Sequence, residues 1–560
     1  MPGRHFLEAL THAHAFLITR NRAPIPPAIA RAFCGAMMST LARPLSSPFA
    51  RSTARDRSIR WSWLSSRYFT LVLLTIALPF ICLAGRPLFG DVWWVMASGQ
   101  EMVRQGQLLQ TDVFTFSPHT STYVDAQWLA QLAYYGAYRL LGLEGVAVFN
   151  ALVGTLAFGL LWHLAWRRSQ SAPVAALCTL FAVLNALWFI HPRAQTLALA
   201  TFAATFWLLG SPRPGARTVI GLGAVEAIWA NLHGSFFLGP LLTLAILAGE
   251  AGDALLQGNR PAALVRSRRL RFLAVAAAAQ IAGSLLNPYG PSLYRYAVAL
   301  SSDPVIRGHI SEWLPTTATD VPQSEFFASV ALMGLALGVA RRRVALADMF
   351  VLVPFAVLGL QANRNIPWWG LVCAPILASY LVRVPVPASV SRLGRYFIPS
   401  QAHLGGNLHR AALIGLVLVG SLPWAKAANP VLPAGQRTMT AEVYPVQAVN
   451  FLTSHDYGRH IFNQHPWGAY LDWQLWPRYQ PMIDPSIELH PADVWFDVQK
   501  LNVGHASWEE LLDKYGVDVL LLSQEEQAQL IEAVRRSPRW QSVYHDDLAQ
   551  VYVRTAEARL

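Results

Sequence analysis

The stretch that decides the fold class runs from residue 69 to residue 106, where "FTLVLLTIALPFICLAG" (69–85) is soon followed by "FGDVWWVMASGQEMVRQG" (89–106). The first part is an uncharged apolar run of about the length that crosses a bilayer. The second part places Asp91 beside Trp93 and Trp94, where the run should leave the membrane. Tryptophan is enriched at membrane interfaces, which explains the aromatic pair. The acid needs a separate explanation.

The composition of the chain indicates a polytopic membrane protein. Of its 560 residues, 54% are hydrophobic and only 14% are charged, which is too apolar for several soluble domains. Its four cysteines form neither a CxxC pair nor a zinc-site spacing. Lysine occurs only at positions 426, 500 and 514, so the preceding part has no Walker-type phosphate loop and no Schiff-base lysine. We expect no direct use of ATP.

Apolar runs recur along the chain and predict about eleven membrane crossings. The candidate spans are 69–86, 143–165, 173–190, 195–210, 217–232, 236–255, 272–287, 326–341, 345–361, 366–382 and 411–425.

Arginine-rich loops predict the orientation of these spans, because such loops stay in the cytoplasm. If residues 1–66 form a basic, disordered cytoplasmic tail, every arginine-rich loop also falls inside. These loops are "WRRSQS", "SPRPGAR", "GNRPAALVRSRRLR", "ARRRV" and "VRVPVPASVSRLGRY". The N-terminus is then cytoplasmic, and residues 67–425 form a multi-pass domain in a bacterial inner membrane. The loop 87–130 and the polar clusters between spans lie on the outer, periplasmic face.

Residues 426–560 differ in character and predict a small periplasmic α/β domain. They carry 11 basic and 17 acidic residues, a net charge of −6, so the preceding part carries +18 of the total of +12. The basic charge therefore belongs to short cytoplasmic loops, and we expect no nucleic-acid partner. Helices are predicted in "AVNFLTSHD", "SWEELLDKYG" and "QEEQAQLIEAVRRS", and strands in "RHIFNQ", "GAYLDWQL", "GVDVLLLS" and "AQVYVR".

The first outer loop holds two candidate catalytic acids, Asp91 and Asp125. "VWWVMASGQEMVRQ" can form an amphipathic helix on the membrane surface, and "TYVDAQWLAQLAYYGAYRLLG" a second helix leading back to it. A carboxylate at this boundary can take a proton from an acceptor hydroxyl or hold a cation. The alternative is that each acid only caps its helix, because Asp is a preferred N-cap residue.

Other polar residues are expected on the same face, and ionisable groups near a bilayer usually face an interior cavity. Arginine also supplies the planar fork that suits a phosphate. Each residue has a structural alternative as well, such as a core histidine, a turn asparagine or an ion pair between arginine and glutamate. The candidate substrate-binding residues are Trp93, Trp94, His191, Arg193, Asn231, His233, Asn287, Glu312, Arg364 and Asn365.

At these residues the sequence resembles the GT-C superfamily of integral-membrane glycosyltransferases. The resemblance runs through "GDVWW…SGQEMVRQGQLLQTDVFTFSPHTSTYVDAQWLAQLAYYGAYRLLGLEG", "HPRAQ", "WANLHGSFFLG", "LLNPYG", "SEWLP" and "RNIPWW", and continues in "IFNQHPWGAYLDWQLWP…MIDPSIELH". It implies a GT-C-like helical membrane domain and a donor sugar carried on a polyprenyl phosphate. The sugar would be transferred with inversion to a cell-envelope glycan, lipid or protein. In this resemblance Asp91 matches the first-loop acid that acts as catalytic base or orients the acceptor.

One departure from the family concerns metal. The first loop has no Asp-x-Asp pair, so a metal-independent transfer is the simpler expectation and no cofactor is predicted. Arg193 and Arg364 are assigned to the lipid phosphate from their charge and side of the membrane. Two other classes stay open at this point: a transporter or flippase of a lipid-linked or envelope precursor, in which the polar face is a vestibule, and an inactive envelope-assembly protein that docks through its C-terminal domain.

Overall fold

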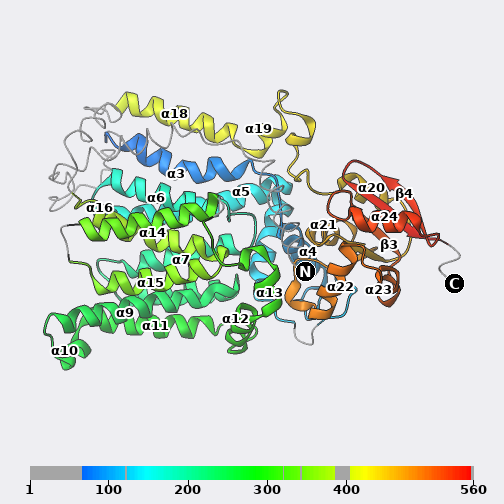
Figure 1. Ribbon diagram of the computed structural model, residues 1–560. Helices are drawn as coiled ribbons and strands as arrows, with labels where there is room; N and C mark the ends of the chain where they lie inside the picture. The colour runs from blue at the N-terminus through cyan, green and yellow to red at the C-terminus, as the bar shows by residue number, and fades with distance from the viewer. Residues whose placement is uncertain (1–65, 120–122, 319–320, 341–342, 385–403, 556–560) are drawn as a thin grey trace.

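The computed structural model describes residues 66–119, 123–318, 321–340, 343–384 and 404–555. It contains a large helical part and, after it in the chain, a smaller α/β part (Figure 1). Residues 1–65 of the predicted cytoplasmic tail lie outside the described residues.

The helices of the large part lie side by side, with α10 at the end farthest from the α/β part (Figure 1). Every predicted span overlaps one of them, because each is an apolar run between polar turns. They are α3 (Phe69–Ala84), α5 (Trp128–Ser169), α6 (Ala172–Leu187), α7 (Ala194–Leu209), α8 (Ala216–Ala230), α9 (Leu238–Leu256), α11 (Arg268–Ser284), α14 (Val321–Val339), α15 (Leu346–Gln361), α16 (Ile366–Leu381) and α18 (Leu404–Gly420).

Two helical segments of the described residues are long and apolar enough to cross a membrane by length and composition, Trp128–Ser169 and Gly234–Leu256. Six further apolar helices have 10 to 17 residues. The number of crossings therefore stays a prediction, whereas the mostly helical fold class with a small C-terminal sheet is observed.

Shorter elements connect these helices to one another and to the α/β part. The helix predicted after Asp91 is α4 (Val92–Gln105), and it is buried between α5 and α21 rather than carrying a free apolar face. The second predicted helix begins later than expected, at Trp128, and continues through a kink at Leu141 and Gly142 into the span that follows. The remaining short elements are η3 (Gly234–Phe237), α10 (Pro261–Arg266), α12 (Ser292–Ser302), α13 (Pro304–His309), η4 (Ser311–Trp313), η5 (Asn363–Asn365) and α19 (Pro423–Ala427).

The α/β part contains a five-stranded sheet in the order β2-β1-β3-β5-β4, in which β1 is parallel to β2 and β3 while β5 is antiparallel to β3 and β4. On β3, Val519 and Leu521 face the core shared with α4 and α5, and Leu520 and Leu522 face a second core under the helices, as strand alternation requires. The strands are β1 (His460–Asn463), β2 (Gln480–Pro481), β3 (Val519–Ser523), β4 (Trp540–His545) and β5 (Ala549–Arg554), and the helices are α20 (Val446–Thr453), α21 (Gly468–Leu475), α22 (Ala492–Asn502), α23 (Trp508–Lys514) and α24 (Ala528–Arg536).

One element of this part was predicted wrongly. "GAYLDWQL" forms helix α21 and not a strand. A run of only eight residues with mixed apolar and polar positions does not distinguish the two periods. The other predicted helices and strands of this part are observed.

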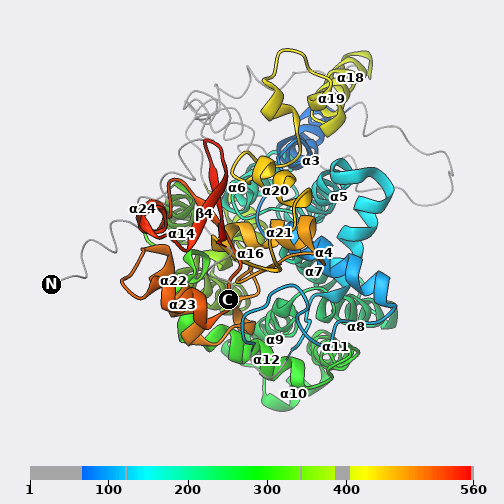
Figure 2. The same cartoon turned by 90° about the vertical axis from the view of Figure 1, so that its right-hand side faces the viewer.

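The α/β part is docked directly on the segment that carries Asp91. Leu88 forms a parallel β-bridge with Thr440, with Leu88 N donating to Met439 O at 2.6 Å. Gly90 has φ +77°, a left-handed conformation that favours glycine, and its N–H donates to the Tyr444 hydroxyl at 2.8 Å. Seen from the side of the α/β part, α4, α20 and α21 lie in front of the helical bundle (Figure 2).

Candidate active site

Three predicted site residues from distant parts of the chain meet in one ion-pair group. Asp91 immediately precedes α4, Arg193 immediately precedes α7, and Glu312 lies in η4. Arg193 Nη1 donates to Glu312 Oε1 at 2.8 Å and to Oε2 at 2.9 Å. The same nitrogen lies 4.0 Å from Asp91 Oδ2. We refer to Asp91, Arg193, Glu312 and Arg364 as the charged cluster.

Hydrogen bonds to main-chain carbonyls hold the two arginines of the charged cluster in place. The Tyr134 hydroxyl donates to Arg193 O at 3.2 Å, and Gln195 Nε2 donates to Arg364 O at 3.0 Å. The Arg364 guanidinium carbon lies 4.4 Å from the centre of the Trp313 ring, close enough for a cation–π interaction. Because the chain is fixed at these points, the side chains are directed by the helix ends that carry them.

The Asp91 carboxyl is solvent-accessible yet desolvated by the protein around it. Its side chain is 45% exposed. Desolvation raises the pKa of Asp91, Arg193 and Arg364 oppose this shift, and Glu312 and Asp484 add to it. Asp91 forms no side-chain hydrogen bond with the start of α4, so the capping alternative lacks the bond that defines an N-cap. A raised pKa makes this carboxylate a stronger base than an ordinary aspartate.

The two arginines of the charged cluster differ in whether a carboxylate pairs with them. Arg193 Nη1 donates to both oxygens of Glu312. Burial raises the pKa of Glu312, but Arg193, followed by Arg364, lowers it by more, so the net shift is downward. Within the described ranges the Arg364 guanidinium has no ion pair and no hydrogen bond. Glu312, Asp91 and Glu488 act on it electrostatically. Arg364 is therefore available to bind an anion.

The two predicted histidines lie beside the charged cluster as neutral groups. His191 Nε2 donates to Trp188 O at 2.9 Å, and His233 Nδ1 accepts from Ser235 N at 3.1 Å. Burial, followed by nearby arginines, lowers the pKa of His191 to about 4 and that of His233 to about 3. Neither histidine adds positive charge at neutral pH.

The side chains of the three predicted asparagines are engaged in hydrogen bonds within the protein. Asn231 accepts from Trp128 Nε1 at 2.8 Å and donates to Ala227 O at 2.7 Å and Leu286 O at 2.8 Å, which ties three helix ends together. Asn287 accepts from Tyr289 N at 2.7 Å and donates to Ser284 O at 2.6 Å, so it forms a turn. Asn365 Nδ2 donates to Leu358 O at 3.0 Å.

The second predicted acid, Asp125, is not part of the charged cluster. Its Oδ1 accepts from Gln127 N at 3.1 Å and from Gln131 Nε2 at 3.0 Å, whereas its Oδ2 is buried without a hydrogen-bond partner. Burial raises the pKa of Asp125 to about 7. Glu488 is the charged residue that acts on it.

The two predicted tryptophans are buried in protein. Trp93 is fully buried, and its ring meets Tyr444 and Tyr470 of the α/β part edge-on, with ring centres 5.8 and 5.1 Å away. Trp94 is also buried. Trp93 therefore packs where the helical part meets the α/β part. The enrichment of tryptophan at the membrane surface does not predict this contact.

Sequence reasoning did not assign a role to Asp484 and Glu488, which come from the α/β part and act electrostatically on the charged cluster. Glu488 Oε1 accepts from the Tyr296 hydroxyl at 3.2 Å, and Asp484 is among the groups that raise the pKa of Asp91. Both residues lie in "MIDPSIELHP". The signal in the sequence is the high density of acidic residues and histidine in that short run.

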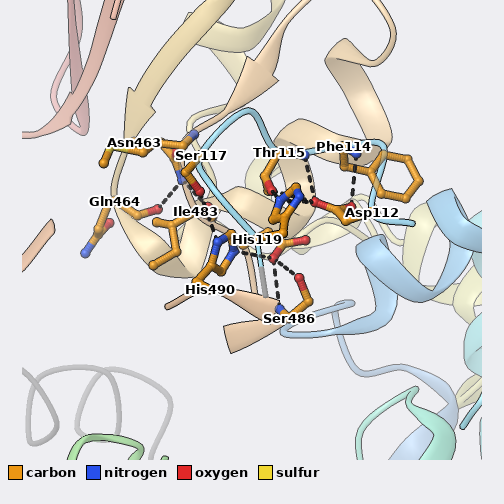
Figure 3. Close-up of polar contacts among 12 residues, drawn as sticks. Asp112, Phe114, Thr115, Ser117, His119, Asn463, Gln464, Ile483, Ser486 and His490 are labelled. Atoms are coloured by element: carbon orange, nitrogen blue, oxygen red, sulfur yellow. Dashed lines mark hydrogen bonds and ion pairs between the residues drawn. The ribbon is translucent and has the colours of Figure 1, made fainter. Parts of the chain in front are cut away.

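A second polar group joins the first loop to the same run of the α/β part (Figure 3). His119 Nε2 lies 3.0 Å from Asp112 Oδ2, and the Ser117 hydroxyl bonds His490 Nδ1 at 3.0 Å. The rings of His119 and His490 are 5.5 Å apart, and His490 Nε2 is 3.6 Å from Asp484 Oδ1. We refer to Asp112, His119, Asp484 and His490 as the histidine contact.

Among the described residues no group of three or more His, Cys, Asp and Glu side chains is arranged to hold a metal ion. The predictions about cofactors and about the role of each site residue remain predictions.

No protein-family model matches the chain, and no curated relative matches its sequence. Among solved structures, it is similar to ArnT from Cupriavidus metallidurans in the apo state, at 15% identity over 87% of this chain and 98% of that chain, with a TM-score of 0.50. The same protein bound to undecaprenyl phosphate matches at 15% identity over 88% and 99%, with a TM-score of 0.47. The archaeal oligosaccharyltransferase AglB from Archaeoglobus fulgidus matches at 14% identity over 88% and 75%, with a TM-score of 0.49.

The similarity to apo ArnT shows the fold. The GT-C-like fold expected from the sequence is therefore confirmed at the level of architecture. At this identity the chemistry has to be argued from the residues of the site.

Proposed function

We propose that this protein is a membrane glycosyltransferase that moves a sugar from a polyprenyl-phosphate donor to a cell-envelope acceptor on the outer face of the inner membrane. The observation that carries the proposal is the pairing of roles within the charged cluster. Asp91 is an accessible carboxyl with a raised pKa, and Arg364 is a guanidinium without an ion pair among the described residues. A general base and an anion-binding group are the two parts that this reaction requires.

In the proposed reaction the acceptor hydroxyl attacks the anomeric carbon of the donor sugar. The hydroxyl proton passes to Asp91, and a new bond joins the acceptor oxygen to the sugar. The bond from the anomeric carbon to the phosphate oxygen breaks, and its electron pair leaves with the lipid phosphate. Arg364 meets the negative charge that develops there. Attack opposite the leaving group inverts the anomeric carbon.

Arg193 has a different part in this proposal because Glu312 already binds its Nη1 on both oxygens. Its Nη1 places positive charge 4.0 Å from Asp91 Oδ2. We infer that Arg193 positions Asp91 and limits the rise in its pKa, so that Asp91 still loses its proton near neutral pH. Arg364 is then the principal group for the phosphate, assisted by the nearby charge of Arg193.

ArnT, whose apo form shares the fold, has also been observed bound to undecaprenyl phosphate. This agrees with a lipid-phosphate donor for the present chain, although the proposal rests on the charged cluster.

The proposal is tested with purified protein, labelled polyprenyl-phosphate sugar and bacterial envelope extract as the source of acceptor. We expect release of free polyprenyl phosphate together with labelled product. Arg364→Gln should slow the release roughly 100- to 1,000-fold, the usual cost of losing a group that stabilises developing negative charge, without lowering the melting temperature. Arg364→Lys should retain part of the activity, and the control Arg260→Gln should retain all of it. A transporter or an assembly protein would release no free lipid phosphate.

A further inference from the structure

A cavity of about 370 Å³ opens beside the end of α3, and Arg364 is not among the residues that line it. Helices α3, α18 and α19 lie next to one another at the edge of the bundle in both views (Figures 1 and 2). The cavity lies where α3 ends and where α18 turns into α19. Its lining residues are Ile81, Cys82, Gly85, Arg86, Gly420, Ser421, Ala425, Lys426, Asn429 and Leu432.

Both charged residues that line this cavity are cations. Arg86 donates to Leu187 O at 2.9 Å, and Lys426 Nζ donates to Gly85 O and Thr438 O at 3.3 Å each. Carbonyl groups orient these side chains but do not neutralise them. No ion pair to either cation occurs within the described part of the chain, and no carboxylate lines the cavity.

The desolvation of Lys426 also favours an anion in this cavity. Desolvation by the surrounding protein lowers the pKa of Lys426, and Glu442 only partly offsets this shift from a distance. A buried or half-buried cation is costly unless an anion accompanies it. The cavity is therefore charged in a way that favours an anionic occupant.

An exposed apolar face of α18 leads to the same cavity. Residues 411–420 contain no charged residue, and several of their large side chains are exposed: Leu413, Leu416, Val417 and Val419. Apolar surface of this extent on a helix is expected to be covered by hydrocarbon or by protein. Here it ends at two cations, so the shape and charge together match an amphiphile with an anionic head.

We propose that the α3–α18 cavity binds the phosphate head group of an anionic membrane phospholipid, with its acyl chains lying along the exposed face of α18. Arg86 and Lys426 would contact the phosphate oxygens through charge-assisted hydrogen bonds. The segment from Arg86 to Asp91 connects this lipid site to the charged cluster, but neither Asp91 nor Arg364 lines the cavity. The lipid site is therefore separable from glycosyl transfer.

The experiment is a titration of the detergent-purified full chain with phosphatidylglycerol, followed by native mass spectrometry. Arg86→Gln/Lys426→Gln should weaken binding of one lipid roughly tenfold or more, because both charge-assisted hydrogen bonds to the phosphate are lost. Ala425→Leu should also weaken it, because it fills the cavity without changing charge. The control Arg260→Gln/Arg266→Gln removes the same charge from the two exposed ends of α10 and should bind as the parent does. Melting temperatures identify any variant that fails to fold, in which case Ala425→Leu decides.

Three results would overturn the proposal. Equal lipid binding by the cavity variants and the control would show that the lipid does not bind in this cavity. Equal affinity for phosphatidylcholine would mean that head-group charge is not recognised. Saturable binding of inorganic phosphate at the same affinity as the lipid, lost in the double variant, would assign the cavity to a free anion instead.

Discussion

Arg193 donates through a single nitrogen, Nη1, to both carboxylate oxygens of Glu312, at 2.8 and 2.9 Å. The two residues are 119 positions apart in the chain. Arg193 is 11% exposed and Glu312 35% exposed, so the pair is neither a fully buried one nor an ordinary surface one. It fixes the loop before α7 to η4, and Asp91 lies at the edge of this pair. The order of the site therefore depends on it.

Breaking the pair should destabilise the fold. Arg193→Gln should lower the free energy of unfolding by about 1–3 kcal/mol, because it leaves a partly buried carboxylate without its donor. Arg193→Gln/Glu312→Gln should recover part of that loss, since no unpaired charge remains. The control Arg536→Gln breaks an exposed pair with Glu532 and should change stability by less than about 0.5 kcal/mol. Denaturant titration in detergent measures all four proteins, and a loss in Arg536→Gln as large as in Arg193→Gln would contradict the prediction.

The fully buried Trp93 ring should stabilise the contact between the helical part and the α/β part. Trp93→Ala should cost about 3–5 kcal/mol through lost burial and the cavity that it leaves, and Trp93→Phe should cost less. Trp424 is 43% exposed, so Trp424→Ala serves as the control with little expected loss. If Trp93 acted only as a membrane anchor, Trp93→Ala would melt in detergent at the temperature of the parent.

The sequence predicts the helices of the large part well because long uncharged runs have a single stable solution in a bilayer. The sequence does not predict which of the polar residues at helix ends lie together in the fold. The hydrogen bond between Arg193 and Glu312, and the packing of Trp93 on Tyr470, depend on contacts between residues far apart in the chain. Short runs such as "GAYLDWQL" are ambiguous for a local reason, since eight residues fit either period.

The candidate site was predicted in part for the same reasons. Charge and predicted side of the membrane selected Asp91, Arg193, Glu312 and Arg364, which the structure brings together. Asn231, Asn287 and Asn365 carried no charge to distinguish binding from structural hydrogen bonding, and their side chains bond main-chain carbonyls. Asp484 and Glu488 follow only from the docking of the α/β part, which periodicity cannot predict.

The histidine contact should make stability depend on pH. The hydrogen bond with Asp112 raises the pKa of His119, and the bonds of Asp112 to His119 and Thr115 lower its own pKa although burial opposes the shift. The contribution of His119 to stability is fully present below its pKa in the unfolded chain, about 6.5, and is lost as pH rises through its pKa in the folded protein. The contribution of Asp112 to stability is present above its pKa in the unfolded chain, about 3.9, and is lost as pH falls through its pKa in the folded protein.

The pair should therefore stabilise most between about pH 4 and 6.5. The difference in melting temperature between the parent and His119→Gln should be larger at pH 5.5 than at pH 8.5. His490, Asp484, Ser117 and Thr115 face the same region and remain unchanged in both proteins. His505→Gln, on an exposed turn of the α/β part, is the control. A difference that stays constant across this range would mean that His119 is not charged in the folded state.

The orientation of the chain can be tested with introduced cysteines. With the native cysteines replaced by alanine, a cysteine at Gly215 should be protected from an impermeant thiol reagent in intact cells, and one at Ser454 should react. The reason is that Gly215 lies in an arginine-rich loop that the positive-inside rule keeps in the cytoplasm, whereas Ser454 lies in the α/β part. Labelling after permeabilisation is the control for reactivity. Equal labelling of both positions in intact cells would reverse or abolish the predicted orientation.

Asp91→Asn should separate chemistry from structure. The substitution keeps the size of the side chain and loses no capping hydrogen bond, since Asp91 forms none with the start of α4, but it removes the proton acceptor. Glycosyl transfer should fall by about two to four orders of magnitude, and the melting temperature should barely change. Because desolvation raises the pKa of Asp91, glycosyl transfer by the parent should decline with falling pH, and this decline should begin at a higher pH than an ordinary aspartate would give.

Asp547→Asn, at an exposed turn of the α/β part, is the matched control and should transfer as the parent does. Near-parent activity in Asp91→Asn would leave the reaction without a base at this position. Asp125→Asn would then be the next variant to measure, because Asp125 is the other candidate acid of the first loop, and its buried carboxyl also has a raised pKa.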